Sequence, residues 1–152
     1  MLEGRHFQNA YVTRDVVKAT EAFRAQADVR QGGVFDLAFQ AKTPQGPEDL
    51  ELKVAVLWVG DLQYELIQPV SGREIYSAAL PPDDSLRFHH IGMRVDDWDE
   101  LHARVARQPY PVVAEGEHGP VRFLYVDARP SFGHYLEYIY MPQDFWTASG
   151  GR

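Results

Sequence analysis

The chain has 152 residues, a formal net charge of −7 and no cysteine, and its length predicts one domain over residues 1–152. The absence of cysteine excludes disulfides, thiolate metal ligands and a cysteine nucleophile, and the acidic charge disfavours binding to nucleic acid. No apolar run reaches the length of a membrane span and the start has no apolar leader, so we expect a cytoplasmic protein without a membrane partner.

The first half of the chain predicts one strand, one helix and three further strands. Residues 7–12 form an apolar segment, and Asp15 then provides an N-cap for a helix whose apolar residues recur at i, i+3 and i+7 from Val16. A turn is expected within Lys42–Asp49, which holds two prolines and a glycine. The three further strands are expected over residues 34–39, 50–59 and 63–69.

The second half repeats this order after a linker over residues 71–87, which holds a short helical segment at Ile75–Leu80. His89–Asp97 aligns with Phe7–Asp15, and a second amphipathic helix follows the aspartate. A loop is expected at Gly116–Pro120, and no element is expected in the tail, Thr147–Arg152. The strands of this half are expected over residues 112–115, 121–127 and 135–140. The repeat predicts an α+β fold of two tandem βαβββ modules, at about residues 5–70 and 88–142.

Four polar side chains occupy matched positions in the two halves. Gln8 and His90 lie in the opening strands, and Glu65 and Glu137 lie in the closing strands. An approximate twofold axis between the halves would bring equivalent strands together, so that the four donors face one concave surface. One imidazole and three oxygen donors suit one divalent metal, such as Zn, Ni, Co, Mn or Mg. The alignment of the aspartates favours His90 over His89 as the ligand.

The sequence resembles the vicinal oxygen chelate superfamily, which includes glyoxalase I and methylmalonyl-CoA epimerase. The resemblance rests on His90–Asp97, Tyr64–Pro69 and Gly133–Tyr140, and it covers nearly the whole chain. It implies paired modules whose curved sheets form a cup around a metal held by the four residues above. Epimerase-like members often have His at the position of Gln8 and Gln at the position of Glu65, so this chain departs from them there.

The resemblance implies a metal-dependent isomerase or lyase of the glyoxalase or epimerase type, with a small carbonyl compound as substrate. In such a site the metal polarises a carbonyl group and a carboxylate removes the α proton. The resemblance to glyoxalase I favours Glu137 as this catalytic base, and Glu65 is the other candidate. Candidate substrate contacts are Arg94, on the same strand face as His90, together with Arg122 and the loop residue His118.

Two other functions remain open. An extradiol-type dioxygenase is known within the same fold, but its chemistry favours two histidines and one carboxylate around iron, and Gln8 replaces one histidine. A non-catalytic protein that resembles bleomycin-resistance proteins would use the cup only to bind a small molecule. Family members commonly dimerise, and the 8 Tyr, 8 Phe and 3 Trp can form an apolar interface, so we expect a homodimer.

Overall fold

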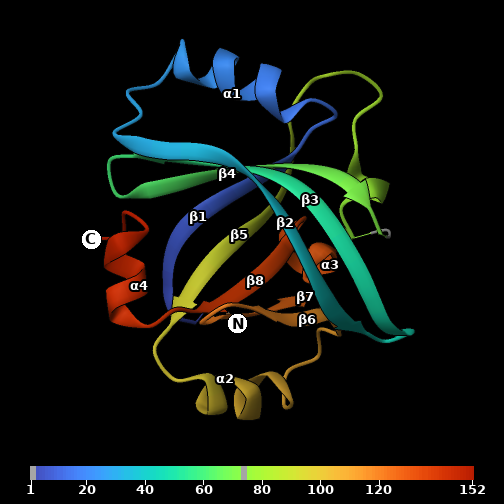
Figure 1. The fold of residues 1–152 in the computed structure, drawn as a ribbon. Helices are drawn as coiled ribbons and strands as arrows, with labels where there is room; N and C mark the ends of the chain where they lie inside the picture. The colour runs from blue at the N-terminus through green and yellow to red at the C-terminus, as the bar shows by residue number, and fades with distance from the viewer. Residues whose placement is uncertain (1–2, 73–74) are drawn as a thin grey trace.

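The strands form a closed, barrel-like sheet with the helices outside it (Figure 1). The computed structural model describes residues 3–72 and 75–152, and the order of strands around this barrel is β1-β4-β3-β2-β6-β7-β8-β5. The strands are β1 (Arg5–Val12), β2 (Gln31–Thr43), β3 (Gly46–Val59), β4 (Leu62–Ser71), β5 (Arg87–Val95), β6 (Val112–His118), β7 (Val121–Val126) and β8 (Tyr135–Tyr140). The predicted α+β class is therefore confirmed.

One helix follows the opening strand in each half, as the sequence predicts. These helices are α1 (Val16–Arg24) and α2 (Trp98–Val105), which lie on opposite sides of the sheet in Figure 1. Each is capped by an aspartate: Asp15 Oδ1 accepts a hydrogen bond from the backbone of Lys18, and Asp97 Oδ1 accepts one from Glu100. The apolar face of each helix packs against the outer side of the sheet, so the inner side remains available for a site.

The register of the central strands determines which side chains meet. β1 pairs in parallel with β4 and antiparallel with β5, and β5 pairs in parallel with β8. Ala10 of β1 lies opposite both Glu65 and His90, and Gly92 of β5 lies opposite both Gln8 and Glu137. Because side chains alternate along a strand, this register brings the four predicted ligands to the interior of the barrel.

The hairpins are longer than the sequence suggests. β2 and β3 continue to Thr43 and Gly46, so the expected turn over residues 42–49 shrinks to Pro44–Gln45. Gly46 has φ +114°, a conformation that permits the tight reversal. The expected loop at 116–120 likewise shrinks to Gly119–Pro120, and His118 becomes the last residue of β6.

The tail is the main error of the sequence-based prediction. Helix α4 (Gln143–Ala148) extends into the first two residues of this tail, Thr147 and Ala148. The buried Trp146 of the same helix, just before the tail, packs edge to face on Phe7 and Trp58. The remaining short elements are η1 (Ser77–Ala79) in the linker and α3 (Arg129–Phe132) before β8. Within the described ranges, no helix has the length and apolar character needed to cross a membrane.

Candidate metal centre

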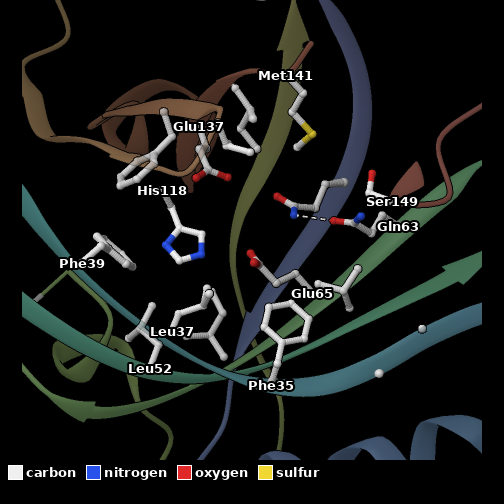
Figure 2. A pocket seen from close by; sticks show the side chains of 18 of the residues that line it. Phe35, Leu37, Phe39, Leu52, Gln63, Glu65, His118, Glu137, Met141 and Ser149 are labelled. Carbon is white, nitrogen blue, oxygen red and sulfur yellow. Dashed lines mark hydrogen bonds between the residues drawn. The ribbon is translucent and has the colours of Figure 1, made fainter. Parts of the chain in front are cut away.

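A cavity of about 600 Å³ lies inside the barrel (Figure 2). Its walls are mainly apolar and come from β2, β3 and β7, with Phe35, Leu37 and Phe39 facing inward at every second position of β2. Its polar groups include Gln8, Gln63, Glu65, His118 and Glu137. The volume is that of a typical small-molecule site.

Two predicted ligands, Glu65 and Glu137, line this cavity, and the buried His90 lies against them. Glu65 from β4, His90 from β5 and Glu137 from β8 each offer a ligand atom, and these atoms all lie within 4.8 Å of one another. His90 Nε2 is 3.1 Å from Glu137 Oε2 and 3.6 Å from Glu65 Oε2. His90 is fully buried, and the two carboxylates are nearly so. This arrangement is a compact cluster of one imidazole and two carboxylates.

A relay of hydrogen bonds sets the tautomer of His90. The carbonyl oxygen of Ile75 can only accept, so His89 Nε2 carries the proton and donates to it. His89 Nδ1 then accepts from His90 Nδ1, at 2.8 Å. Burial lowers the pKa of both histidines to about 3, so both rings are neutral. His90 Nε2 therefore presents a lone pair to the two glutamates, as a metal ligand must.

The two carboxylates are held in an environment that disfavours their charge. Burial raises the pKa of Glu137 to about 8, although a hydrogen bond from Tyr125 partly opposes this. Burial, and then the charge of Glu137, raises the pKa of Glu65 well above its ordinary value. Tyr125 in turn accepts a hydrogen bond from Tyr76 at 3.0 Å. Two buried acids that repel each other would be stabilised by a cation between them.

Gln8 lies on the same inner face, beside the cluster. Its Nε2 donates to Gln63 Oε1 at 2.7 Å, shown by the dashed line in Figure 2. Its Oε1 is buried without a hydrogen-bond partner. A Cβ at Gly92 would lie 2.6 Å from this oxygen, so a glycine is needed there to make room for the Gln8 side chain.

These residues fit a divalent metal. Gln8 Oε1 is buried without a hydrogen-bond partner, and His90 Nε2 has no donor facing it unless Glu137, 3.1 Å away, is protonated. Such orphaned acceptors are costly unless something positive satisfies them. The donors are one nitrogen and several oxygens, a set that suits Zn, Ni, Co, Mn or Mg. The cluster of Glu65, His90 and Glu137 could therefore hold the divalent metal that the sequence predicts, and Gln8 as a fourth ligand stays a prediction.

The predicted substrate contacts have different locations. His118 lines the cavity, but Arg94 and Arg122 are not among the described residues that do. The Arg94 guanidinium stacks 4.7 Å from the centre of the Trp146 ring and donates to Gln143. Arg122 points to the outer side of β7, because Phe123 and Tyr125 occupy its inner face. The structure therefore brings only His118 of these three to the cavity.

Sequence reasoning missed three residues of the site. Gln63 lies two positions before Glu65, and this spacing on a strand already placed both on one face. Tyr125 shares the inner face of β7 with Phe123, which was a weaker signal. The role of His89 had no signal in the sequence, because it depends on a carbonyl group in the linker.

Comparison with known proteins supports this interpretation of the fold. The sequence model of the Glyoxalase/Bleomycin resistance protein/Dioxygenase superfamily matches residues 7–125. The chain therefore belongs to this superfamily, and the predicted relation to the vicinal oxygen chelate proteins is confirmed. No curated protein sequence matches the chain significantly.

Several solved structures share the fold at low sequence identity. Methylmalonyl-CoA epimerase from Mycobacterium tuberculosis has a TM-score of 0.65 at 16% identity, over 97% of each chain. A methylmalonyl-CoA epimerase in complex with methylmalonyl-CoA and NH4+ has a TM-score of 0.66 at 16% identity, over 92% of this chain and 96% of the other. A hypothetical protein from Bacillus halodurans C-125 has a TM-score of 0.63 at 16% identity, over 91% and 95%.

Proposed function

We propose that this chain is a metal-dependent isomerase or lyase of the glyoxalase or epimerase type, which removes a proton α to a carbonyl group. The observation that carries the proposal is the cluster of Glu65, His90 and Glu137, whose two glutamates line a cavity of small-molecule size. Together with Gln8, these residues would hold the metal. A bound divalent cation supplies Lewis-acid polarisation of a substrate carbonyl.

The two glutamates are the candidate proton-transfer groups. Glu137 accepts a hydrogen bond from Tyr125, and Glu65 lies close to it, since the ligand atoms of both glutamates and His90 are within 4.8 Å of one another. A carboxylate bound to a metal has little basicity, so Glu137 would have to loosen from the metal when substrate oxygens bind before it could accept the C–H proton. In the proposed reaction Glu137 accepts the α proton. Either Glu137 or a Glu65 carboxyl that has taken up a proton from solvent then donates a proton to the substrate.

Membership of the superfamily supports an enzyme of this kind. The epimerase structures, at 16% identity, support it through the shared fold alone. The extradiol alternative is less favoured, because the cluster contains one imidazole rather than two. A simple binding protein is favoured by one observation, the large apolar cavity. Metal content separates that candidate from the enzyme.

We also propose that the chain works as two tandem modules within a cytoplasmic homodimer. The same order of one strand, one helix and three strands in each half supports the modules. Phe88 and Phe132 are each about 40% exposed on either side of His134, and this patch supports a subunit interface. Sedimentation of a clean monomer at tens of micromolar would contradict the homodimer.

The decisive experiment joins metal content with proton exchange. Protein purified without chelator should hold one Zn, Ni, Co or Mn per chain, and loaded protein should catalyse solvent deuterium exchange at the α carbon of hydroxy ketones, followed by NMR. Chelator should abolish this exchange. A chain that binds no divalent metal would contradict the proposal, and iron with oxygen uptake would favour the dioxygenase.

A further inference from the structure

The described part of the cavity wall holds no lysine or arginine, and its one basic side chain is the histidine His118. Among the described residues that line it, the acids that project inward are Glu65 and Glu137, whereas Asp36 lies on the alternate face of β2. A bound divalent cation would not change this balance, because the two buried glutamates carry the opposite charge. An anionic group on a ligand would therefore meet no net positive charge in the cavity.

Three basic side chains of the barrel and its adjoining segments are engaged elsewhere. Arg30 lies over the Trp58 ring, at 5.1 Å from its centre, and donates to the carbonyl oxygens of Gly60 and Gly150. Lys53 belongs to the outer face of β3 and lies 3.8 Å from the exposed carboxylate of Asp36. As described above, Trp146 and Gln143 hold Arg94. None of these three cations can turn inward without losing its present contacts.

The wall opposite the metal cluster is hydrocarbon. Phe35, Leu37 and Phe39 project from β2, and Leu52 projects from the paired strand β3. Figure 2 shows the β2 side chains and Leu52 across the cavity from Glu137. A buried carboxylate or phosphate against such a wall loses its hydration without gaining a partner, which is strongly unfavourable.

We infer that the substrate is an uncharged, largely apolar carbonyl compound. Its body lies against Phe35, Leu37 and Phe39, and its oxygens point toward Glu65, His90 and Glu137. The placement of the oxygens rests on the proposed function, whereas the exclusion of negative charge rests on the cavity walls alone. Ligands that must place an anionic group inside the cavity are excluded.

A pair of matched ligands tests this inference. The neutral probe is 2-hydroxy-1-(4-methylphenyl)ethanone, and the anionic probe is 4-(2-hydroxyacetyl)benzoate, which carries a carboxylate in place of the methyl group remote from the two oxygens. Calorimetric titration should show the neutral probe binding about 100-fold more tightly, because the buried carboxylate is unpaired. Equal or tighter binding of the benzoate would overturn the inference.

Two neighbouring residues provide a matched pair of variants. Phe35 lines the cavity and is 43% exposed, whereas Val34 is 41% exposed and belongs to the other face of β2. Phe35→Arg should improve benzoate binding at least about 10-fold by pairing with its carboxylate, and Val34→Arg should leave it unchanged. Equal improvement in both variants would show a long-range charge effect and contradict the inference. Both positions are accessible to solvent, and Phe35→Lys provides a second variant.

The titrations separate this inference from the proposed function. They are repeated on metal-loaded and chelator-treated protein. If the neutral probe is preferred in both states but no metal binds, the proposed function fails and the inference stands. If metal binds and α-proton exchange occurs while the benzoate is preferred, the inference fails and the proposed function stands.

Discussion

The Nδ1 atoms of His89 and His90 lie 2.8 Å apart, and this contact leaves His90 Nε2 unprotonated toward the glutamates. His89 is therefore expected to position a metal ligand without touching the metal. His89→Phe keeps the ring contacts with Tyr76 and Tyr135 but removes the acceptor. We expect it to weaken metal binding by about 10–100-fold.

The tautomer of the His90 ring can be measured directly. In the metal-free parent, nitrogen NMR should show the proton of His90 on Nδ1, and in His89→Phe the two tautomers should mix. His90→Ala should abolish high-affinity binding altogether. Unchanged metal affinity and an unchanged His90 tautomer in His89→Phe would show that the relay has no role.

Glu137→Gln separates proton transfer from metal binding. The amide keeps an oxygen donor and the size of the side chain, but it cannot accept the α proton. Much of the metal should remain bound, while the rate of solvent exchange at the α carbon should fall by about 10²–10⁴-fold. Exchange at the parent rate with metal bound would place the base elsewhere, and Glu65→Gln and then His118→Gln would be measured next.

The metal-free chain should lose stability as the pH rises. Burial raises the pKa of Glu137 to about 8 from an ordinary value of 4.5, so between these values the folded state holds a proton that the unfolded state has released. The free energy of unfolding then falls with rising pH, by up to about 1.4 kcal/mol per pH unit for this proton.

Urea denaturation at several pH values from 5 to 8 checks the sign. Other groups contribute to the parent profile, so the informative quantity is the difference between the parent and Glu137→Gln, in which this slope should be absent. Identical slopes would mean that Glu137 is ionised in the folded metal-free chain. Saturating divalent metal should remove the loss at high pH, because the metal binds the deprotonated carboxylate.

The sequence predicted the strands that carry the site better than the cavity around it. Glu65 and Glu137 were found because each half repeats the same strand with the same alternation, and the aspartate caps located both helices. The apolar wall was not predicted, because it forms only when β2 of the first half and β7 of the second half join the same closed sheet. Arg94 illustrates the limit: its strand face was predicted correctly, but α4 covers it with Trp146.

Gly92→Ala should disturb the metal site through Gln8. The added Cβ would lie 2.6 Å from Gln8 Oε1 and 2.9 Å from its Cβ, so the glutamine side chain must move. Metal affinity should fall to the level of Gln8→Ala. Gly33→Ala is the matched control, since its Cβ would meet nothing within 4 Å, and its metal affinity should equal that of the parent. Parent-like affinity in Gly92→Ala would exclude Gln8 as a ligand.

Trp146 should anchor α4 to the barrel. Its side chain is 1% exposed, its ring centre lies 5.0 Å from that of Phe7 and 5.5 Å from that of Trp58, and Gly151 packs directly on it. Trp146→Ala removes these contacts and leaves a void, which should cost about 3–5 kcal/mol in the free energy of unfolding. For a chain of this length that corresponds to a melting temperature lower by roughly 10 °C.

Phe145 is the control for Trp146, since it is the adjacent residue of α4 and is 39% exposed at the cavity. Phe145→Ala should change the free energy of unfolding much less, because a half-exposed ring buries less apolar surface. It should nevertheless weaken binding of the neutral hydroxy ketone, since Phe145 lines the cavity. Urea denaturation and calorimetric titration of both variants measure the two effects. Equal destabilisation by Phe145→Ala and Trp146→Ala would mean that the helix as a whole, rather than the buried indole, holds this part of the chain to the barrel.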